Sequence, residues 1–465
     1  MKTEFTPGIG LSAPLPGARQ ALGLLLLINL LNYIDRQVLA AVVPQIKESF
    51  FGPNGTGTGE TLTHLLAWCQ NHLGFKPENA LIGVLSMAFM VVYMLGAPLF
   101  GKLAERHSRW VLISVGVILW SLATGASGLA VGFFMLLATR CFVGIGEAAY
   151  GPVAPTVISD FYPVKVRGQV LAWFYMAIPV GSALGYVIGD AVARSSIGTW
   201  GHEVLGFKAE SWRWAFYLVV IPGILLGLRS YFMKDPPRGQ ADQAQGGPAR
   251  TFGWRDYTIL LRTPSYVFCT LGMTAMTFAM GGIAFWMPYF LSQKPGAPAS
   301  ATSTFGAITV VAGLAATLLG GIAGDRLRPR FPGSYFLVSG LAMLVGFPFM
   351  LLTVNAGFPM IWVWLFLACF CLFFNTGPTN TILANVTHPG IRAAGFALNI
   401  FVIHALGDVI SPVIIGIVSD RYSMTLAFMV VGFMFVVAGA LWLAGMRFLQ
   451  RDTERAPTRL STTAP

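Results

Sequence analysis

The hexapeptide GKLAER, at Gly101–Arg106, returns 220 residues later as GIAGDR, at Gly321–Arg326. Both copies follow the pattern G-x-x-x-[DE]-R. A second set of matches lies 225 or 226 residues apart: Gly151-Pro152, Pro163 and Arg167 are repeated as Gly377-Pro378, Pro389 and Arg392. Short patterns of this kind are frequent by chance, but two sets in the same register predict an internal duplication of one structural unit.

The composition places both copies in a membrane. Of the 465 residues, 55% are hydrophobic and only 11% are charged, and the mean hydropathy is +0.67. A soluble globular protein has about 25% charged residues, so this chain lacks the polar side chains needed to cover a water-facing surface. The apolar run at Leu22–Leu31 does not read as part of a cleavable signal peptide, and we take it as part of the first membrane span.

Apolar segments of about 20 residues, the length that crosses a bilayer as a helix, occur twelve times. Six precede and six follow a polar segment rich in proline, glycine and glutamine, at Lys234–Asp256. The predicted spans are 18–43, 79–102, 110–131, 132–158, 166–190, 211–233, 265–291, 301–323, 332–354, 358–384, 391–418 and 425–447. The sequence therefore predicts an all-α polytopic membrane protein. Its expected parts are a six-helix bundle at 1–233, a cytoplasmic linker at 234–264, a pseudo-symmetric second six-helix bundle at 265–447 and a cytoplasmic tail at 448–465.

Lysine and arginine are spread unevenly over the predicted loops. With a cytoplasmic N-terminus, 21 of the 30 lie in cytoplasmic segments, seven lie in outside loops, and Arg36 and Arg140 lie inside spans. The positive-inside rule then predicts that both termini and the linker are cytoplasmic. This distribution accounts for the formal net charge of +11 without a nucleic-acid partner.

The repeated hexapeptide resembles the signature of the major facilitator superfamily, G-x-x-x-D-[RK]-x-G-[RK]-[RK]. The first copy departs from it at Glu105, Ser108 and Trp110, and the second copy has Arg328-Pro329 around the place of the second glycine. Within the superfamily, four segments are similar to the Spinster family: NYIDR at Asn32–Arg36, RCFVGIGEAAYGPVAPTVISDFYP at Arg140–Pro163, FYMAIPVGSALGYVIG at Phe174–Gly189 and GGIAFWMPYF at Gly281–Phe290. The resemblance implies a bacterial, Spinster-like, proton-coupled lipid transporter with the major facilitator fold.

Four charged residues fall inside predicted spans: Asp35, Arg36, Arg140 and Glu147. A charge at the centre of a bilayer costs at least about 2.5–3.5 kcal/mol, so these side chains must face one another or a water-filled cavity. Arg140 and Glu147 are two helical turns apart and share a face, whereas Asp35 and Arg36 point about 100° apart. Either Asp35 pairs with Arg140 or Arg36 pairs with Glu147, and a purely structural ion-pair network is the alternative to a functional site.

A carboxylate that burial makes easier to protonate can take a proton from one side of the membrane and release it on the other. We expect Glu147 to carry this proton rather than Asp35, because Gly144 and Gly146 leave room beside it. The family resemblance implies that Asp35 and Glu147 both take part in proton coupling, with Arg36 and Arg140 alongside for the carboxylates or an anionic substrate.

The two hexapeptides predict a cytoplasmic gate. By family precedent the loop holds the two halves together in the outward-facing state, and anchoring by the positive-inside rule is the alternative, which we favour for Arg109 alone. The residues assigned to this gate are Gly101, Glu105, Arg106, Asp160, Gly321, Asp325 and Arg326.

Several side chains of the second half are candidates for lining a substrate cavity. They are Phe285, Trp286, Tyr289, Asn375, Asn380, Asn399, His404 and Asp408. The aromatic residues can equally serve as packing, and the asparagines can equally hold helices together by hydrogen bonds. His404 and Asp408, at i and i+4, can form a proton relay or a simple packing contact.

The predicted function is secondary active transport by alternating access, and the sequence leaves two alternatives. The family implies an amphiphilic anionic lipid, such as a lysophospholipid or a sphingosine-1-phosphate-like molecule; the first alternative is a small organic anion, sugar acid or drug. The second, a membrane receptor or membrane-embedded enzyme, is disfavoured because no catalytic cluster occurs. Without a P-loop or a metal-ligand spacing, we expect no cofactor and no metal, a proton gradient as the energy source, and a monomer among membrane lipids of a bacterial inner membrane.

Overall fold

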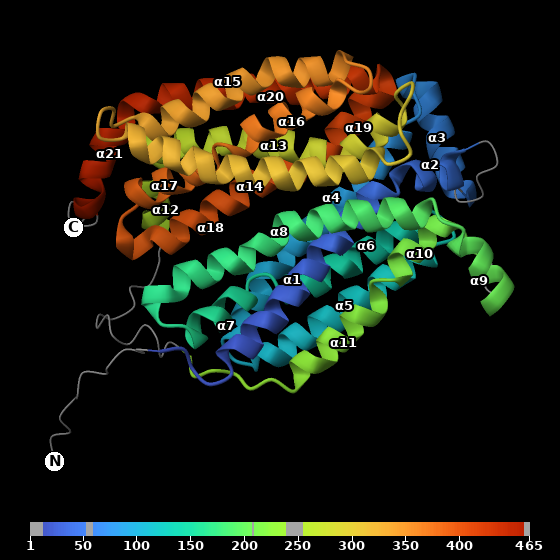
Figure 1. The fold of residues 1–465 in the computed structure, drawn as a ribbon, viewed down its shortest axis with the longest axis horizontal. Coiled ribbons are helices and arrows are strands. Elements are labelled where there is room, and N and C mark those ends of the chain that lie inside the picture. Colours follow the sequence, from blue (N-terminus) through green and yellow to red (C-terminus); the bar gives the residue numbers. More distant parts are fainter. Residues whose placement is uncertain (1–12, 53–58, 207–208, 239–253, 460–465) are drawn as a thin grey trace. The chain divides into compact units, whose positions relative to one another are not determined.

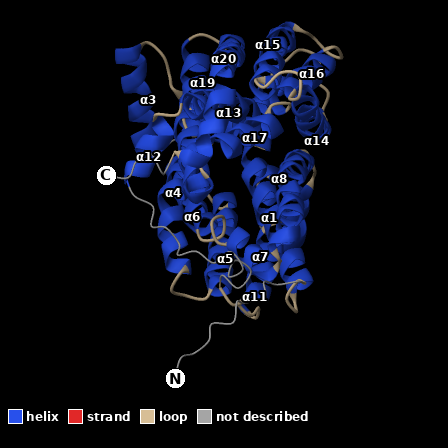
Figure 2. Ribbon diagram, turned by 90° about the vertical axis from the view of Figure 1, so that its left-hand side faces the viewer, coloured by secondary structure: helices blue, strands red, loops and turns tan. Residues whose placement is uncertain are grey.

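The computed structural model describes residues 13–52, 59–206, 209–238 and 254–459. Part of the predicted linker, 239–253, and the end of the predicted tail, 460–465, lie outside these residues. Helices and connecting loops make up the described residues, which contain no strand (Figure 2). The chain forms two compact units: unit 1 is Met1–Gly59 with Ala88–Ala249, and unit 2 is Glu60–Met87 with Arg250–Pro465.

Unit 1 contains most of the helices of the first half of the chain (Figure 1). They are α1 (Ala18–Ala41), α2 (Val43–Phe51), the larger part of α4 (Glu78–Ala104), α5 (Arg109–Gly128), α6 (Phe133–Ala148), α7 (Ala154–Phe161), α8 (Val164–Ala193), α9 (Ile197–Leu205), α10 (Ser211–Tyr217) and α11 (Val220–Tyr231).

Unit 2 contains the helices of the second half and the start of α4. In chain order they are α3 (Gly59–Leu73), α12 (Trp254–Leu261), α13 (Pro264–Ser292), α14 (Ala301–Leu327), α15 (Ser334–Asn355), α16 (Ile361–Phe373), α17 (Thr376–Val386), α18 (Arg392–Ile403), α19 (Ser411–Arg421), α20 (Met424–Gly445) and α21 (Leu449–Arg455). A π-helix, η2, covers His404–Asp408, and three short 3₁₀ helices cover Pro389–Ile391, Met446–Phe448 and Ala456–Thr458. The predicted linker and tail thus hold α12 and α21.

Eleven helical stretches among the described residues are long and apolar enough to cross a membrane. They are Ala18–Ala41, Glu78–Ala104, Arg109–Gly128, Val166–Ala193, Ser211–Tyr231, Pro264–Ser292, Ala301–Leu327, Ser334–Asn355, Ile361–Val386, Ala394–Arg421 and Met424–Thr458. Each coincides with one of the twelve predicted spans.

The predicted fourth span, 132–158, is the exception, because five residues, Ala149–Val153, separate α6 from α7. The two helices have 16 and 8 residues, and neither is long enough to cross alone. The segment between them contains Gly151 and Pro152, and Pro155 follows in the first turn of α7. Proline lacks the N–H that continues a helix and clashes with the preceding turn, so the interruption directly after Glu147 follows from the sequence.

The α1–α8 contact is the most extensive helix pairing among the described residues of unit 1. Gly181, Gly185 and Gly189 recur every fourth residue of α8 and place its backbone against α1. A methyl group at Gly185 would lie 2.5 Å from the carbonyl oxygen of Ile34, and one at Gly181 would lie 2.7 Å from that of Leu30. Small residues at this spacing let membrane helices approach closely, and here they fix the helix that carries Asp35 and Arg36.

Unit 2 is organised around α13, α15 and α20. Gly340 of α15 and Gly439 of α20 face each other: a methyl group on either would lie 3.0 Å from the carbonyl oxygen of the other. Trp442, which is completely buried, donates a hydrogen bond of 3.2 Å to the carbonyl of Cys269 on α13. Close glycine contacts and the hydrogen bond of a buried indole thus hold α13, α15 and α20 together.

Candidate functional site

The four intramembrane charges of the first half come from two helices. Asp35 and Arg36 lie on α1, and Arg140 and Glu147 lie on α6. Asp35, Arg140 and Glu147 are each only 1% exposed, and the Arg36 side chain is 16% exposed. Burial at this level predicts that every charge is compensated by a partner or by a bound group.

Two glycines of α6 set the position of its charged residues. A methyl group at Gly144 would lie 2.5 Å from the carbonyl oxygen of Phe89 on α4, and one at Gly146 would lie 2.7 Å from that of Gly116 on α5. The turn that follows α6 is tied to α1 by a 2.8 Å hydrogen bond from the Tyr150 hydroxyl to the carbonyl of Leu25. The glycines beside Glu147 therefore let α4 and α5 approach α6 closely.

Of the two pairings that the sequence left open, the structure contains the one between Arg36 and Glu147. The Nε and Nη2 atoms of Arg36 lie 2.8 and 2.7 Å from Oε2 of Glu147. Both contacts go to one carboxylate oxygen, and the hydrogen bond from Nε is charge-assisted, which is the stronger class of hydrogen bond. No hydrogen bond or ion pair joins Asp35 to Arg140 in the described structure.

Three aromatic rings enclose the Arg36 guanidinium. Its central carbon lies 5.0, 5.1 and 5.2 Å from the ring centres of Tyr33, Phe89 and Tyr93. The Phe89 ring also contacts a second cation, because the central carbon of the Arg140 guanidinium lies 5.2 Å from its centre. Cation–π attraction supports a cation that has lost its water, so these rings complete the environment of the Arg36–Glu147 pair. The sequence analysis did not single them out, because aromatic residues in a membrane span are common.

Asp35 and Arg140 are held differently. One oxygen of Asp35 accepts a 2.5 Å hydrogen bond from the hydroxyl of Thr124 on α5, a residue that the sequence analysis missed. Its other oxygen, Oδ1, is buried without a hydrogen-bond partner, and so are Nε and Nη1 of Arg140 and Oε1 of Glu147. Ser114, Ser121 and Ser127 place three more hydroxyls in the same helix, so no signal in the sequence singled out Thr124.

The loop that holds the first hexapeptide forms a second charged cluster in unit 1. Arg109, the first residue of α5, is 4% exposed and donates through Nη1 to Asp160 at 2.5 Å. Its Nη2 donates to the carbonyl of Pro236 at 3.0 Å, and its backbone N–H donates to Asp235 at 2.8 Å. Arg109 is therefore a buried ion-pair residue, and the anchoring role favoured for it does not describe its environment.

Glu105 and Arg106 do not share in that cluster through their side chains. Both are exposed, and neither side chain forms a hydrogen bond or ion pair with another described residue. The Glu105 backbone carbonyl accepts a bond from Arg238, which also donates to the carbonyl of His107 at 2.7 Å. Asp160 thus pairs with Arg109 rather than with the hexapeptide arginine.

The second hexapeptide ends α14 in unit 2. Asp325 accepts a 2.7 Å hydrogen bond from the hydroxyl of Tyr335 at the start of α15, while Arg326 is exposed. The backbone at Gly321 is approached by Gly377 of α17, whose added methyl group would lie 3.3 Å from the Gly321 α-carbon. The two copies share a sequence pattern, but their carboxylates have different partners.

His404 and Asp408 do meet, as their spacing predicts. His404 Nδ1 lies 3.0 and 2.9 Å from the two oxygens of Asp408, and the two side chains are 35% and 19% exposed. They bound the π-helix η2, which replaces a regular helical turn between α18 and α19. The α13 backbone leaves room for this wider turn at Gly281, where a methyl group would lie 2.6 Å from the Asp408 β-carbon. Such π-helical turns are rare and are frequent at functional sites.

The aromatic candidates of α13 are only in part exposed. Trp286 has no exposed surface, and its indole N–H donates a 2.8 Å hydrogen bond to the carbonyl of Pro412 on α19. In this structure Trp286 is a packing residue of the α13–α19 contact. Phe285 is 7% exposed and stacks edge-on against Trp286, and Tyr289 is partly exposed.

The asparagine candidates also differ from one another. Asn375 is completely buried, and its amide donates to the carbonyl of Leu372, three residues earlier, at 2.7 Å and lies 3.5 Å from the sulfur of Met343 on α15. Asn399 is 1% exposed, and its side-chain oxygen has no partner. Asn380 is exposed and bonds back to the carbonyl of Thr376 at 2.8 Å. Of the three, Asn380 alone presents polar atoms at a surface.

The sequence comparisons match the chain to one family. The model described as Major Facilitator Superfamily matches residues 25–407. Protein spinster homolog 3 of Danio rerio is 33% identical over 421 residues, which is 87% of this chain and 77% of that protein. Protein spinster homolog 1 of Homo sapiens is 32% identical over 463 residues, 92% and 80% of the two chains. The chain belongs to the Spinster family.

Solved structures of other transporters share its fold. A bacterial homologue of the human lysosomal transporter Spinster, in an inward-facing and unoccupied conformation, has a TM-score of 0.81 at 23% identity and covers 94% of this chain and 98% of its own. The xylose transporter XylE from E. coli, in an inward-open conformation, has a TM-score of 0.68 at 16% identity, with coverage of 92% and 96%. This Spinster protein is therefore an integral membrane transporter with the alternating-access fold of the superfamily.

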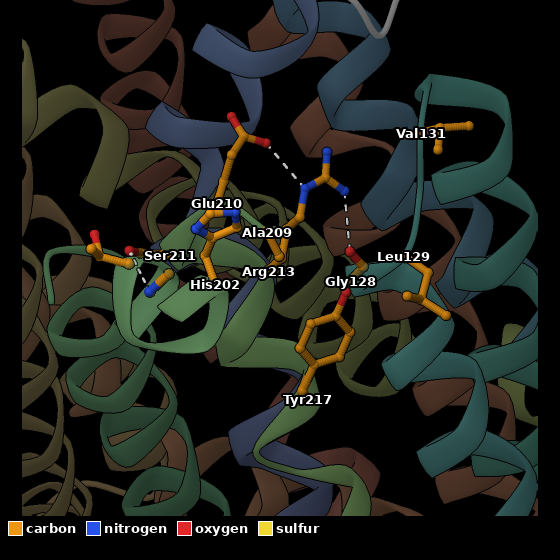
Figure 3. Close-up of a pocket in the computed structure, with 11 residues that line it drawn as sticks. Gly128, Leu129, Val131, His202, Ala209, Glu210, Ser211, Arg213 and Tyr217 are labelled. Atoms are coloured by element: carbon orange, nitrogen blue, oxygen red, sulfur yellow. Dashed lines mark hydrogen bonds and ion pairs between the residues drawn. The ribbon is translucent and has the colours of Figure 1, made fainter. Parts of the chain in front are cut away.

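One cavity of unit 1 lies apart from all of these residues (Figure 3). It has a volume of about 740 Å³ and is lined by residues of α9, α10 and the α5–α6 connection, among them His202 and Tyr217. Arg213 crosses it, donating to Glu210 at 3.1 Å and to the carbonyl of Gly128 at 3.1 Å. None of the residues assigned to the site of this Spinster family member lines this cavity.

Proposed function

We propose that the chain moves an amphiphilic anionic lipid, such as a lysophospholipid or a sphingosine-1-phosphate-like molecule, by alternating access coupled to protons. The observation that carries the proposal is the buried cluster of Asp35, Arg36, Arg140 and Glu147. Its formal charges cancel, yet buried polar atoms of three of its members have no hydrogen-bond partner. A buried charge without a partner is costly, so this arrangement favours a site that exchanges a proton and a ligand over a finished structural network.

Asp35 is the proton carrier in this proposal, although the sequence favoured Glu147. Glu147 already accepts a charge-assisted hydrogen bond from Arg36 and forms an ion pair with it, and a proton there would weaken both. Asp35 holds one hydroxyl bond and keeps a second oxygen unoccupied. A proton can therefore bind Asp35 without disturbing another pair.

Arg140 is the substrate-binding cation. When Asp35 is protonated, the cluster carries one net positive charge, and the Nε and Nη1 atoms of Arg140 have N–H groups available for an anionic head group. The planar guanidinium can bind a carboxylate or phosphate through two bonds. Proton and anion then occupy the site together, which makes the transporter a symporter. The lipid assignment rests on membership of the Spinster family, not on the cluster itself.

The remaining parts of the proposal follow from the sequence. We expect the chain to act as a monomer in a bacterial inner membrane, with both termini cytoplasmic and the proton gradient as the energy source. We also expect it to need no cofactor and no metal. With this orientation, α1 ends and α4 begins on the outer side.

The test is the proton exchange that accompanies substrate binding. Purified protein in weakly buffered detergent with a pH indicator is mixed with an anionic lysolipid, lysophosphatidylglycerol, or with a sugar acid, glucuronate. We expect proton uptake with the lysolipid in the native protein and in Asp190→Asn, a control whose aspartate pairs with Arg194 one turn along its own helix. Uptake should be lost in Asp35→Asn.

Each other outcome is decisive. Uptake that persists in Asp35→Asn removes Asp35 as the carrier. Uptake with glucuronate alone makes the chain a small-anion transporter, and the absence of any proton exchange with either compound contradicts proton coupling.

A further inference from the structure

We propose that Gly416–Arg421, at the end of α19, is a latch on the start of α4, and that Asp420 must release α4 whenever the transporter opens to that side of the membrane. The latch deepens the alternating-access function already assigned to the fold. It depends on neither proton coupling nor the identity of the substrate.

Asp420 caps the first turn of α4 with both carboxylate oxygens. Its Oδ1 accepts the backbone N–H of Asn79 at 3.0 Å, and its Oδ2 accepts that of Ala80 at 2.8 Å. The Asn79 side chain donates to the hydroxyl of Ser419 at 3.1 Å. The first N–H groups of a helix lack partners within it and carry partial positive charge, so a carboxylate is the best cap.

Two glycines bring the backbones together for this cap. A methyl group at Gly416 would lie 2.6 Å from backbone atoms of Asn79 and Ala80, and one at Gly83 would lie 2.5 Å from the carbonyl oxygen of Pro412. Gly416 precedes Asp420 by one helical turn, and Gly83 follows Asn79 by one turn, so the four residues form one continuous contact. No side chain can enter between the helices at these points.

The position of α4 gives the contact its importance. The helix runs unbroken from Glu78 to Ala104, yet its residues up to Met87 group with unit 2 and those from Ala88 group with unit 1. A movement of the two units against each other must therefore either bend α4 or part its first turns from α19. The cap and the glycine contact are what must break in the second case.

The latch sequence GIVSDR is a third copy of the hexapeptide pattern G-x-x-x-[DE]-R. Each half of a major facilitator transporter contains two three-helix repeats of inverted topology, so the second span of a half corresponds to the fifth. GIAGDR ends the second span of the second half, and GIVSDR ends the fifth. Inverted topology puts these two ends on opposite sides of the membrane, and the third copy is therefore a counterpart of the predicted cytoplasmic gate on the other side.

The experiment measures the population of the state that is open on the α4–α19 side. Spin labels are placed on exposed positions after α8 and α13, at Ser196→Cys and Gln293→Cys. The background is Cys141→Ser, because the other four cysteines are buried. Distance distributions of the full chain in lipid nanodiscs are recorded for the latch variants and controls.

We expect Asp420→Asn to raise the ratio of long to short distances about tenfold, the effect of a lost helix cap. Asparagine keeps only one acceptor oxygen and no charge. Gly83→Ala should shift the ratio in the same direction by a different route, through its clash with α19. The matched control, Asp190→Asn, replaces a buried aspartate whose ion pair lies within α8 and should leave the ratio unchanged.

The proposal is overturned if folded Asp420→Asn and folded Gly83→Ala both give the native distance distribution, or if Asp190→Asn shifts it equally. Folding is checked by a single symmetric gel-filtration peak. If Asp420→Asn does not fold, Gly83→Ala decides the question alone. Because no substrate or proton is involved, failure of the latch leaves the proposed function standing, and failure of the proposed function leaves the latch measurable.

Discussion

Neutralising the two acids of the buried cluster one at a time separates a structural carboxylate from a coupling one. In Glu147→Gln, the Arg36 guanidinium keeps its three aromatic neighbours but loses its anion. Removing one partner of a buried ion pair costs about 3–5 kcal/mol. The rings and the remaining amide oxygen hold the expected loss of unfolding free energy to about 3 kcal/mol.

Asp35→Asn removes much less from the folded state. The amide oxygen can still accept the Thr124 hydroxyl, and the second oxygen of Asp35 has no bond to lose. The expected loss of unfolding free energy is about 1 kcal/mol. For a unit of roughly 200 residues, about 1 kcal/mol corresponds to about 2–4 °C in Tm. Glu147→Gln should therefore lower Tm by about 6–12 °C, and Asp35→Asn by about 2–4 °C.

The assay is thermal unfolding in detergent, followed by tryptophan fluorescence and by gel filtration of heated samples. A double variant, Arg36→Met with Glu147→Gln, should regain at least half of the loss, because it removes the unpaired cation as well. The reasoning is refuted if Asp35→Asn lowers Tm as much as Glu147→Gln, or if the double variant is the least stable of the three.

Three further substitutions test the packing and the second charged cluster, each by thermal unfolding. Gly185→Ala should lower the free energy of unfolding by about 1–3 kcal/mol, because its methyl group meets the α1 backbone. Gly23→Ala, which has open space around it, should leave that free energy unchanged, and equal effects of the two would contradict the α1–α8 contact. Arg109→Ala should lower the free energy of unfolding by about 3–5 kcal/mol because it leaves the buried Asp160 without its cation. The exposed Arg106→Ala should change it by no more than about 0.5 kcal/mol, and a larger effect at Arg106 than at Arg109 would contradict the assignment of the ion pair. Trp286→Phe should cost about 1–3 kcal/mol by leaving a buried carbonyl unpaired, and an unchanged Tm would argue that the indole bond is dispensable.

Much of the fold could be predicted because membrane spans leave a strong one-dimensional signal. Length and apolar composition identify a span without any knowledge of its neighbours, and eleven of the twelve predicted spans appear as helices long enough to cross. The fourth is interrupted at Gly151 and Pro152, residues that the sequence analysis used as repeat markers and did not use as helix breakers. Gly151 and Pro152 therefore mark the internal repeat and also interrupt the helix, and the interruption determines the structure of this span.

The site could be predicted as a set of residues but not as a set of contacts. Charges inside a span are costly wherever they lie, so Asp35, Arg36, Arg140 and Glu147 stand out from sequence alone. Which acid meets which base depends on the rotation and depth of two helices, α1 and α6, and these are set by glycines of α8 and of α6 itself. Thr124 and the aromatic rings around Arg36 contribute only through this geometry, and no property of their own distinguishes them beforehand.

The repeated hexapeptide shows why a pattern and its function have to be argued separately. In the first copy the residue that forms the buried ion pair is Arg109, three positions beyond the pattern, while its own acid and base stay in solvent. In the second copy the aspartate binds a tyrosine hydroxyl. In the third copy, Gly416–Arg421, Asp420 caps the first turn of α4. What the three share is a glycine one turn before a carboxylate at the end of a membrane helix. Only in the third copy does that glycine meet a neighbouring backbone, because a methyl group at Gly101 or Gly321 would have no atom within 4 Å. The neighbouring chain therefore determines what each carboxylate binds.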